Sequence, residues 1–217
     1  MKTSPKLPAA PPHDCPLCPR LAAFRADNRK KHPDWFNAPV PSFGPLNARL
    51  LIAGLAPGLQ GANRTGRPFT GDWAGDLLYG TLLKLGLAKG DYDERIDDTL
   101  ELVDCRIANS VRCVPPQNKP EPSEIKTCRQ FLISELESLP KVKVILALGK
   151  IAHDSVCDAL GARKILNPFK HGAVYEKIGR FALISSYHCS RYNTNTGVLT
   201  ERMFEDVVGK AKTLAGI

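Results

Sequence analysis

The strongest constraint on the fold is a glycine-rich segment between two apolar ones. It covers residues 54–72 and reads GLAPGLQGANRTGRPFTGD. The apolar run before it, Leu50–Ala53, predicts a buried strand, and the apolar periodicity of residues 73–87 predicts a helix. Open α/β sheets bind their ligands where a strand ends and its loop begins. The segment therefore predicts a ligand-binding loop at the carboxyl end of a sheet strand.

The side chains of this loop narrow the class of ligand. Glycines let a backbone come close to a ligand and present its N–H groups. Arg64, Arg67, Phe69 and Asp72 supply two cations, an aromatic face and a carboxylate, which suits a nucleotide with the arginines near its phosphates. The spacing fits neither a dinucleotide fingerprint nor a P-loop. Similar loops also occur in α/β proteins without catalysis, so both interpretations stay open.

The rest of the chain alternates between strands and helices. Strands are expected at about 49–54, 103–110, 142–148 and 181–186, and helices at about 19–31, 73–87, 122–139, 151–160 and 200–214. Ser123 is the expected cap of the third of these helices. This alternation predicts an α/β fold, a three-layer α/β/α sandwich with a central four-stranded parallel sheet. The loops after the first, second and fourth strands should then meet at one edge.

Composition is that of one globular domain with a short extension. The chain has 217 residues, of which 43% are hydrophobic and 24% charged. Residues 1–12 contain four prolines and few large apolar groups, so we expect a disordered arm before a single domain at 13–217. No apolar run approaches the ~20 residues that span a bilayer, and no secretory signal is visible. We therefore expect a cytoplasmic monomer that binds no membrane.

The charge balance favours a polyanionic partner. A net charge of +8 suits nucleic acid, because cations that contact phosphates release counterions. Basic side chains concentrate near the N-terminus, where they either contact DNA or form a solvated helix face: Arg20, Arg25, Arg29, Lys30, Lys31 and His32.

The seven cysteines fit a metal site better than a disulfide framework, since their number is odd and no export signal precedes them. Cys15 and Cys18 form a CxxC pair, and fourteen residues separate Cys113 from Cys128. Four thiolates suit zinc or a [4Fe–4S] cluster, and a spacing unlike that of a zinc ribbon favours the cluster. A redox CxxC or unrelated buried thiols are the alternatives. The remaining thiols on apolar stretches, at 105 and 157, are expected in the core.

Three separated motifs carry a resemblance to a known family. The loop at 54–72, ANSVRCVPPQNKPEPSE and HCSRYNTNTG, together with the four cysteines, resemble the uracil-DNA glycosylase superfamily, and most closely its iron–sulfur-bearing family 5. The resemblance covers nearly all of the chain from Cys15 to the last helix. It implies a structural [4Fe–4S] cluster on Cys15, Cys18, Cys113 and Cys128, no nucleotide cofactor, and excision of uracil, with other deaminated bases possible, from double- and single-stranded DNA.

The same resemblance assigns roles around a pocket for a flipped base. Asp72 would activate water, because Leu55 and Ala56 of the first motif are apolar, and His188 would stabilise the departing base. No lysine in the motifs is placed as a Schiff-base nucleophile, so a monofunctional glycosylase is implied. The base-binding set consists of Gly54, Leu55, Ala56, Phe69 for stacking, Asn109 for the base edge, and His188. Cys189 stands where the family usually has proline.

Each of these residues has an ordinary structural alternative. Asp72 could only cap the helix, Asn109 could cap a turn, and His188 could be a hydrogen-bonded histidine at a strand end. Residues 191–193 either enter the minor groove or form a surface loop. The competing functions are a non-catalytic nucleic-acid-binding protein with a structural Fe–S or Zn module, and an electron carrier.

Overall fold

The strands of the main sheet are buried apolar runs. A computed structural model describes residues 7–217, and its strands are β1 Leu50–Gly54, β2 Ala88–Lys89, β3 Glu101–Leu102, β4 Cys105–Asn109, β5 Val144–Leu148, β6 Val174–Ile178 and β7 Phe181–Ser186. Every residue of β1 and β5 is buried, as expected for parallel strands covered on both faces. The helices are α1 Pro19–Lys31, α2 Ala62–Thr65, α3 Trp73–Lys84, α4 Pro122–Ser138, α5 Lys150–Ala159, α6 Arg191–Asn195 and α7 Glu201–Ala215.

The main sheet has the order β4-β1-β5-β7-β6. Its first four strands are parallel, as predicted, but β6 adds a fifth strand that runs antiparallel to β7. The four-stranded expectation is corrected to this extent. Sequence patterns missed β6 because only Ile178 of it is buried, and Glu176 and Lys177 face solvent. Gly179, with a φ of 62°, supplies the left-handed residue that the tight turn into β7 requires.

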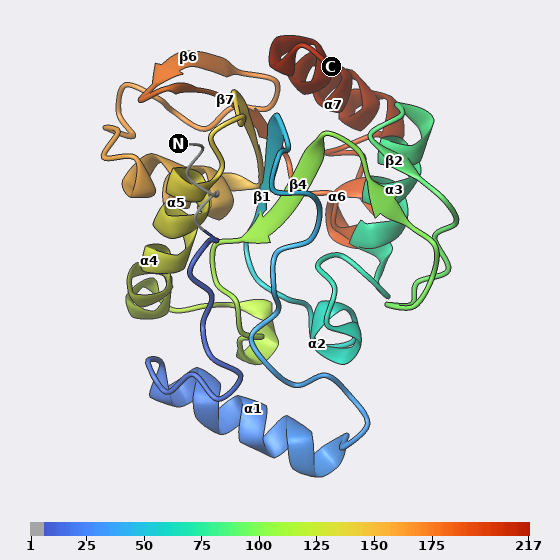
Figure 1. Cartoon of the computed structure of the whole chain (residues 1–217), viewed down its shortest axis with the longest axis vertical. Helices are drawn as coiled ribbons and strands as arrows, with labels where there is room; N and C mark the ends of the chain where they lie inside the picture. The colour runs from blue at the N-terminus through green and yellow to red at the C-terminus, as the bar shows by residue number, and fades with distance from the viewer. Residues whose placement is uncertain (1–6) are drawn as a thin grey trace, which may run out of the picture.

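Helices cover both faces of the sheet (Figure 1). Successive side chains of a strand point to opposite faces. Leu50 and Ile52 of β1 therefore join one apolar cluster, which includes residues of α3 and α7. Leu51 and Ala53 join the other cluster, which includes residues of α4 and α5. This arrangement is the expected α/β/α sandwich, and its sheet edge positions the loops that follow β1, β4 and β7.

Helix α1 lies away from the sheet, at the lower edge of Figure 1. Its Arg20 contacts Glu124 of α4 at 2.7 Å. Glu124 also accepts the backbone N–H of Glu121, which completes a capping box at the start of α4. The cap of α4 is thus Glu121, and the expectation of Ser123 was wrong. Pro122 occupies the first helical position, so the capping residue precedes it.

Part of the expected disordered arm, residues 1–6, lies outside the described residues. In the described part of that arm, the backbone N–H of Ala9 donates to Ser134 Oγ at 2.8 Å. Among the helices of residues 7–217, none combines the length and apolar character needed to cross a membrane.

Candidate active site

A pocket of about 390 Å³ opens at the carboxyl edge of the parallel strands. The loops after β1, β4 and β7 meet there, as the order of elements predicted. Of the residues expected to bind or act on a base, all but Gly54 line the wall, and Gly54 packs directly behind two of them. The lining residues are Leu55, Ala56, Pro57, Gly58, Ala62, Phe69, Asp72, Trp73, Ala74, Asn109, Asn118, His188, Ser190 and Arg191.

Asn109 lines the pocket, and its amide oxygen is itself buried and unpaired within the described residues. It ends β4 beside Gly54, its partner in the parallel register. The residue is 3% exposed, and Oδ1 has no hydrogen-bond partner within residues 7–217. A Cβ on Gly54 would lie 2.3 Å from this oxygen and 2.8 Å from Cζ of Phe69, so only glycine fits. A buried acceptor without a donor is costly. The amide is therefore suited to a ligand that brings an N–H group.

Phe69 forms an aromatic wall next to Asn109. Its φ of 54° is left-handed, a conformation that costs a bulky residue energy and that clusters at functional sites. Gly75 permits this turn, since a Cβ there would lie 1.8 Å from the carbonyl oxygen of Phe69. The ring centroid of Phe69 is 6.1 Å from that of His188, with 28° between the planes. The two rings thus contribute neighbouring, nearly parallel faces.

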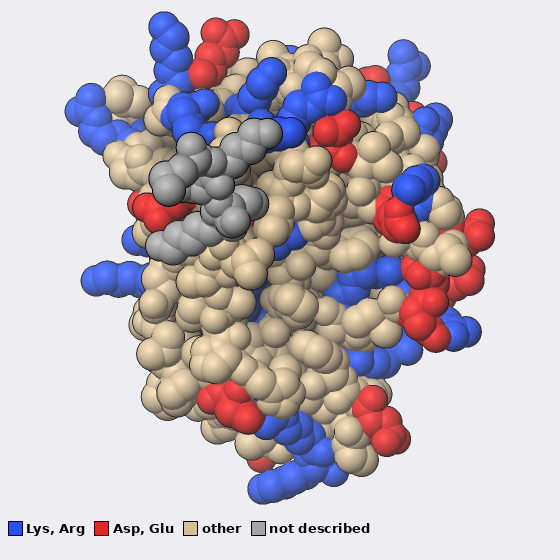
Figure 2. All heavy atoms as spheres, viewed as in Figure 1, with Lys and Arg blue, Asp and Glu red and all other residues tan. Residues whose placement is uncertain are grey.

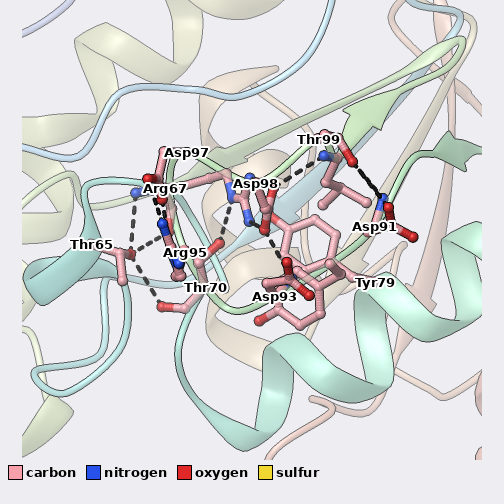
Figure 3. A network of polar contacts seen from close by, with 12 residues as sticks. Thr65, Arg67, Thr70, Tyr79, Asp91, Asp93, Arg95, Asp97, Asp98 and Thr99 are labelled. Carbon is pink, nitrogen blue, oxygen red and sulfur yellow. Dashed lines mark hydrogen bonds and ion pairs between the residues drawn. The ribbon is translucent and has the colours of Figure 1, made fainter.

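Arg67 is not free to contact phosphates, contrary to expectation. Its guanidinium is 3% exposed and donates to both carboxylate oxygens of Asp98, at 2.7 and 2.6 Å, and to Thr70 Oγ1 at 2.7 Å (Figure 3). It also lies 5.2–5.8 Å from three ring centroids, those of Phe43, Tyr79 and Tyr92. This buried pair ties the loop that carries Phe69 to residues 91–99. Arg64 remains exposed.

Asp72 caps α3 and lines the pocket at the same time. Its Oδ1 accepts the backbone N–H of Gly75 at 3.2 Å, which makes the expected helix cap. Its Oδ2 lies against the glycine-rich loop, where a Cβ on Gly58 or Gly61 would come within 2.9 and 2.3 Å. Burial raises the pKa of this carboxyl group, and the N–H groups of Gly75 and Ala74 oppose the rise. The two roles thus use different oxygens and are compatible.

His188 follows β7 and is uncharged at neutral pH. Burial lowers its pKa to about 4, so the imidazole can donate one N–H and accept at its other nitrogen. The Asn193 side chain donates to the carbonyl oxygen of His188 at 2.8 Å, and Ser190 caps α6. Cys189, which replaces the usual proline, is fully buried in the apolar cluster beneath. These contacts fix the loop that carries His188.

The four cysteines of the expected metal site line one small, largely apolar cavity between α1, α4 and the loop after β4: Cys15, Cys18, Cys113 and Cys128. The backbone N–H of Arg112 donates to Cys128 Sγ at 3.4 Å, and Arg25 Nη1 lies 3.5 Å from Cys113 Sγ. Burial raises the pKa of Cys113 to about 12, so binding a metal there would release protons. Across residues 7–217, no three His, Cys, Asp or Glu side chains approach closely enough to hold one metal ion. The thiols at 105 and 157 belong to the core, as expected.

Comparison with known proteins agrees with this geometry. Residues 41–212 match the family model of the uracil DNA glycosylase superfamily. This chain belongs to that superfamily. A Type-5 uracil-DNA glycosylase from Thermus thermophilus is 47% identical over 209 residues, which cover 94% of both chains. Type-5 enzymes from Pyrobaculum aerophilum and Mycobacterium tuberculosis are 38% and 40% identical over 94% of this chain and 90% and 79% of theirs. The resemblance inferred from the three motifs is confirmed.

Uracil-DNA glycosylases act on DNA, so the Lys and Arg side chains that are not engaged within the fold are candidates for contacts with phosphates. In the basic run near the N-terminus, three arginines serve the fold. Arg20 contacts Glu124, Arg25 donates to the Cys15 carbonyl at 2.9 Å, and Arg29 pairs with Asp14. Lys30 and Lys31 stay exposed. In Figure 2, further Lys and Arg side chains gather along the upper edge, over the region of β6 and α7.

For two residues of this glycosylase fold, Trp73 and Arg191, the sequence did not predict a place in the pocket wall. Trp73 is the first residue of α3 and is 48% exposed. The signal in the sequence was its position, a large aromatic residue directly after Asp72, which caps the helix. Arg191 was expected either in the minor groove or in a surface loop, not in the pocket wall. Of the pocket-lining residues, it is the one Lys or Arg side chain. Asn193, considered with it, instead turns inward to the His188 carbonyl.

Proposed function

We propose that this protein is a monofunctional glycosylase that removes uracil from double- and single-stranded DNA. The observation that carries the proposal is the pocket in which Asn109 Oδ1 lacks a partner beside Phe69, His188 and Asp72. A base within a duplex is out of reach, so it must be flipped into such a pocket at a cost of a few kcal/mol. The relatives named uracil-DNA glycosylases support this substrate.

The pocket groups suit the edge and face of uracil. Asn109 Oδ1 can accept the N3–H of uracil, and its amide N–H can donate to O4. This contact would satisfy the oxygen that the protein leaves unpaired. Stacking against Phe69 would recover ~1–3 kcal/mol of the flipping cost. Cytosine carries no N3–H, so it could not satisfy Asn109 in the same way.

Hydrolysis breaks the C1′–N1 bond and forms a C1′–O bond with water. Negative charge develops on the departing base, and a neutral His188 can donate to its O2, much as an oxyanion hole does. Positive charge develops on the sugar, where the Asp72 carboxylate can stabilise it and orient the water. No lysine belongs to the described pocket wall, which fits hydrolysis without Schiff-base lyase action.

The activity is tested with oligonucleotides that carry one uracil, single-stranded or opposite guanine. Abasic sites revealed by alkali cleavage are the expected product. DNA binding with no abasic product from any substrate would refute the enzyme and favour the non-catalytic binding protein.

Variants at three pocket positions test the assigned roles. Asn is as good a helix cap as Asp, so Asp72→Asn should keep the stability of the fold while excision falls at least ~10²-fold. His188→Ala should lower kcat by ~10²–10³-fold, the usual cost of losing one such donor. Asn109→Ala should weaken uracil excision and its discrimination from cytosine. Full activity of Asp72→Asn would show that this carboxylate only caps the helix.

The second part of the proposal concerns the thiol cavity. Cys15, Cys18, Cys113 and Cys128 would hold a structural [4Fe–4S] cluster that tethers α1 to the loop after β4. A cluster spreads its four thiolates over a wider span than one tetrahedral ion does, which suits thiols that share a cavity without converging on one point. The nearby N–H donors of Arg25 and Arg112 would stabilise bound thiolates.

Iron and sulfide analysis of anaerobically purified protein tests the cluster. About four of each per chain are expected, and Cys113→Ser should lose them. Cys157→Ser is the matched control, because that thiol is also buried but belongs to the apolar cluster with residues of α4 and α5. Stoichiometric zinc, or iron that persists in Cys113→Ser, would contradict the assignment.

A further inference from the structure

Trp73 stands out at the rim of the pocket. It is 48% exposed, yet a side chain of this size is normally buried or in contact with a partner. Its indole N–H donates to Thr194 Oγ1 of α6 at 2.9 Å, which fixes the ring across the gap between α3 and α6. The ring thus forms a rigid, exposed aromatic face next to the space proposed for the flipped base.

Trp73 also lies between two spaces that differ in their charge balance. It lines the 390 Å³ pocket, where Arg191 is the one Lys or Arg of the described wall. On its other side it lines a second cavity of about 530 Å³, which includes the carboxylates of Asp76 and Glu201. The first space holds one carboxylate, that of Asp72, beside Arg191, whereas Glu205 adds a third carboxylate to the second, whose described lining has no Lys or Arg. Phosphates are therefore repelled more strongly from the second space than from the first. A DNA strand that crosses the rim should therefore run its backbone past Arg191.

Arg191 already lies over the indole, with Cζ 5.8 Å from the ring centroid. A guanidinium can leave such a cation–π contact for a phosphate, because a charge-assisted bond to phosphate is the stronger interaction. Because Arg191 and Trp73 lie this close together, a phosphate bound by Arg191 would place the neighbouring base near the Trp73 ring. Single-stranded bases stack on exposed aromatic faces of this kind whatever their sequence.

We infer that Trp73 and Arg191 form a second nucleobase site, in which the base next to the flipped nucleotide stacks on Trp73 while its phosphate contacts Arg191. This inference rests on the proposed glycosylase function. Stacking would stabilise the distorted strand and would make excision depend on the adjacent base, with purines preferred because their larger faces overlap more of the indole.

A substrate comparison tests the site. Single-stranded oligonucleotides carry one uracil, with adenine or a tetrahydrofuran spacer on its 5′ or 3′ side. Adenine at the stacked position should raise kcat/KM by about 5- to 150-fold over the spacer, the equivalent of ~1–3 kcal/mol per stacked base. Trp73→Ala should bring that ratio close to one, and Trp73→Phe should keep part of it. A ratio that Trp73→Ala leaves unchanged would overturn the inference, whereas a structural defect lowers both rates alike.

Fluorescence supplies a readout that needs no excision. The chain has two tryptophans, so Trp35→Phe leaves Trp73 as the single reporter. Trp35 stacks on His32 instead, with centroids 3.9 Å apart. An oligonucleotide with a spacer in place of the uridine should quench Trp73 more strongly when adenine is its neighbour. Quenching that ignores the neighbour would refute stacking, even in an active enzyme. Neighbour-dependent quenching in a protein without excision would refute the proposed function alone.

Discussion

Removal of Asp98 with Arg67 left in place should destabilise the fold by about 3–5 kcal/mol, the usual cost of leaving one partner of a buried ion pair uncompensated. The Arg67 side chain is 3% exposed and that of Asp98 0%, so water cannot replace the lost carboxylate. Thr70 Oγ1 alone would still accept from the guanidinium. A domain of ordinary stability, about 5–15 kcal/mol, would lose at least about a fifth of its margin.

Urea unfolding followed by circular dichroism measures this loss. With a slope of ~1–3 kcal/mol per molar urea, Asp98→Ala should lower the midpoint by at least about 1 M. Asp97→Ala is a matched control in the same loop (Figure 3), since Asp97 pairs with Arg95 at the same 2.6 Å distance but both side chains are more than 60% exposed. Its midpoint should stay close to that of the wild type, because solvent screens an exposed pair.

A double-mutant cycle separates the pair from the cavity that the truncation leaves. Arg67→Met should cost much less in the Asp98→Ala background than in the wild type, with a coupling above ~1 kcal/mol. Burial opposes ionisation of Asp98, but Arg67 holds its pKa below the ordinary value. The stabilisation is therefore present above about pH 4 and disappears as pH falls through the lowered pKa. Additive single effects, or a midpoint for Asp98→Ala equal to that of Asp97→Ala, would refute this reasoning.

Three further predictions concern the pocket. Burial raises the pKa of Asp72 and lowers that of His188 to about 4. The pH–rate profile of kcat/KM should therefore be level from pH 6 to 8 and should fall in acid, as Asp72 becomes protonated at a pH above its ordinary pKa. A histidine inflection near pH 6.5 would contradict this. Gly54→Ala should lower excision at least ~5-fold, because its Cβ would push Asn109 and Phe69 apart at an overpacking cost of ~1–3 kcal/mol. Gly80 lies on the exposed side of α3, with no atom within 4 Å of a new Cβ. Gly80→Ala should therefore keep full activity and raise the free energy of unfolding by about 0.5–1 kcal/mol, which urea unfolding measures as a higher midpoint.

Sequence patterns were sufficient to locate the strands whose residues are buried along nearly their whole length. The strands β1, β5 and β7 are apolar runs bounded by loops, and the sequence located them within one or two residues. The loop at 54–72 was recognisable from its glycines, of which Gly54 and Gly61 leave room for the side chains of Asn109 and Asp72. At these positions, the glycine seen in the sequence is also the residue that the packing of neighbouring side chains requires.

The sequence was a poor guide where a residue's role depends on a distant partner. Arg67 resembles a phosphate ligand until Asp98, 31 residues later, is found beside it. β6 lacks an apolar run because an edge strand needs only one buried face. Trp73 looked like an ordinary start of an amphipathic helix, and its exposure follows from the position of α6, which no local pattern encodes.

Several arginines of this chain are buried and therefore do not act as surface cations. Arg67, Arg106 and Arg112 make buried contacts with carboxylates, for which the planar guanidinium, with its fork of donors, is suited. Asp98 neutralises Arg67, and Arg106 and Arg112 share the single carboxylate of Glu135, so these buried groups add little to the outer field. The net charge of +8 must act mainly through exposed side chains. Such charges attract DNA over a distance set by ionic strength. Salt should therefore slow association with DNA steeply, while the selectivity for uracil over cytosine, set inside a pocket with one rim cation, should change little.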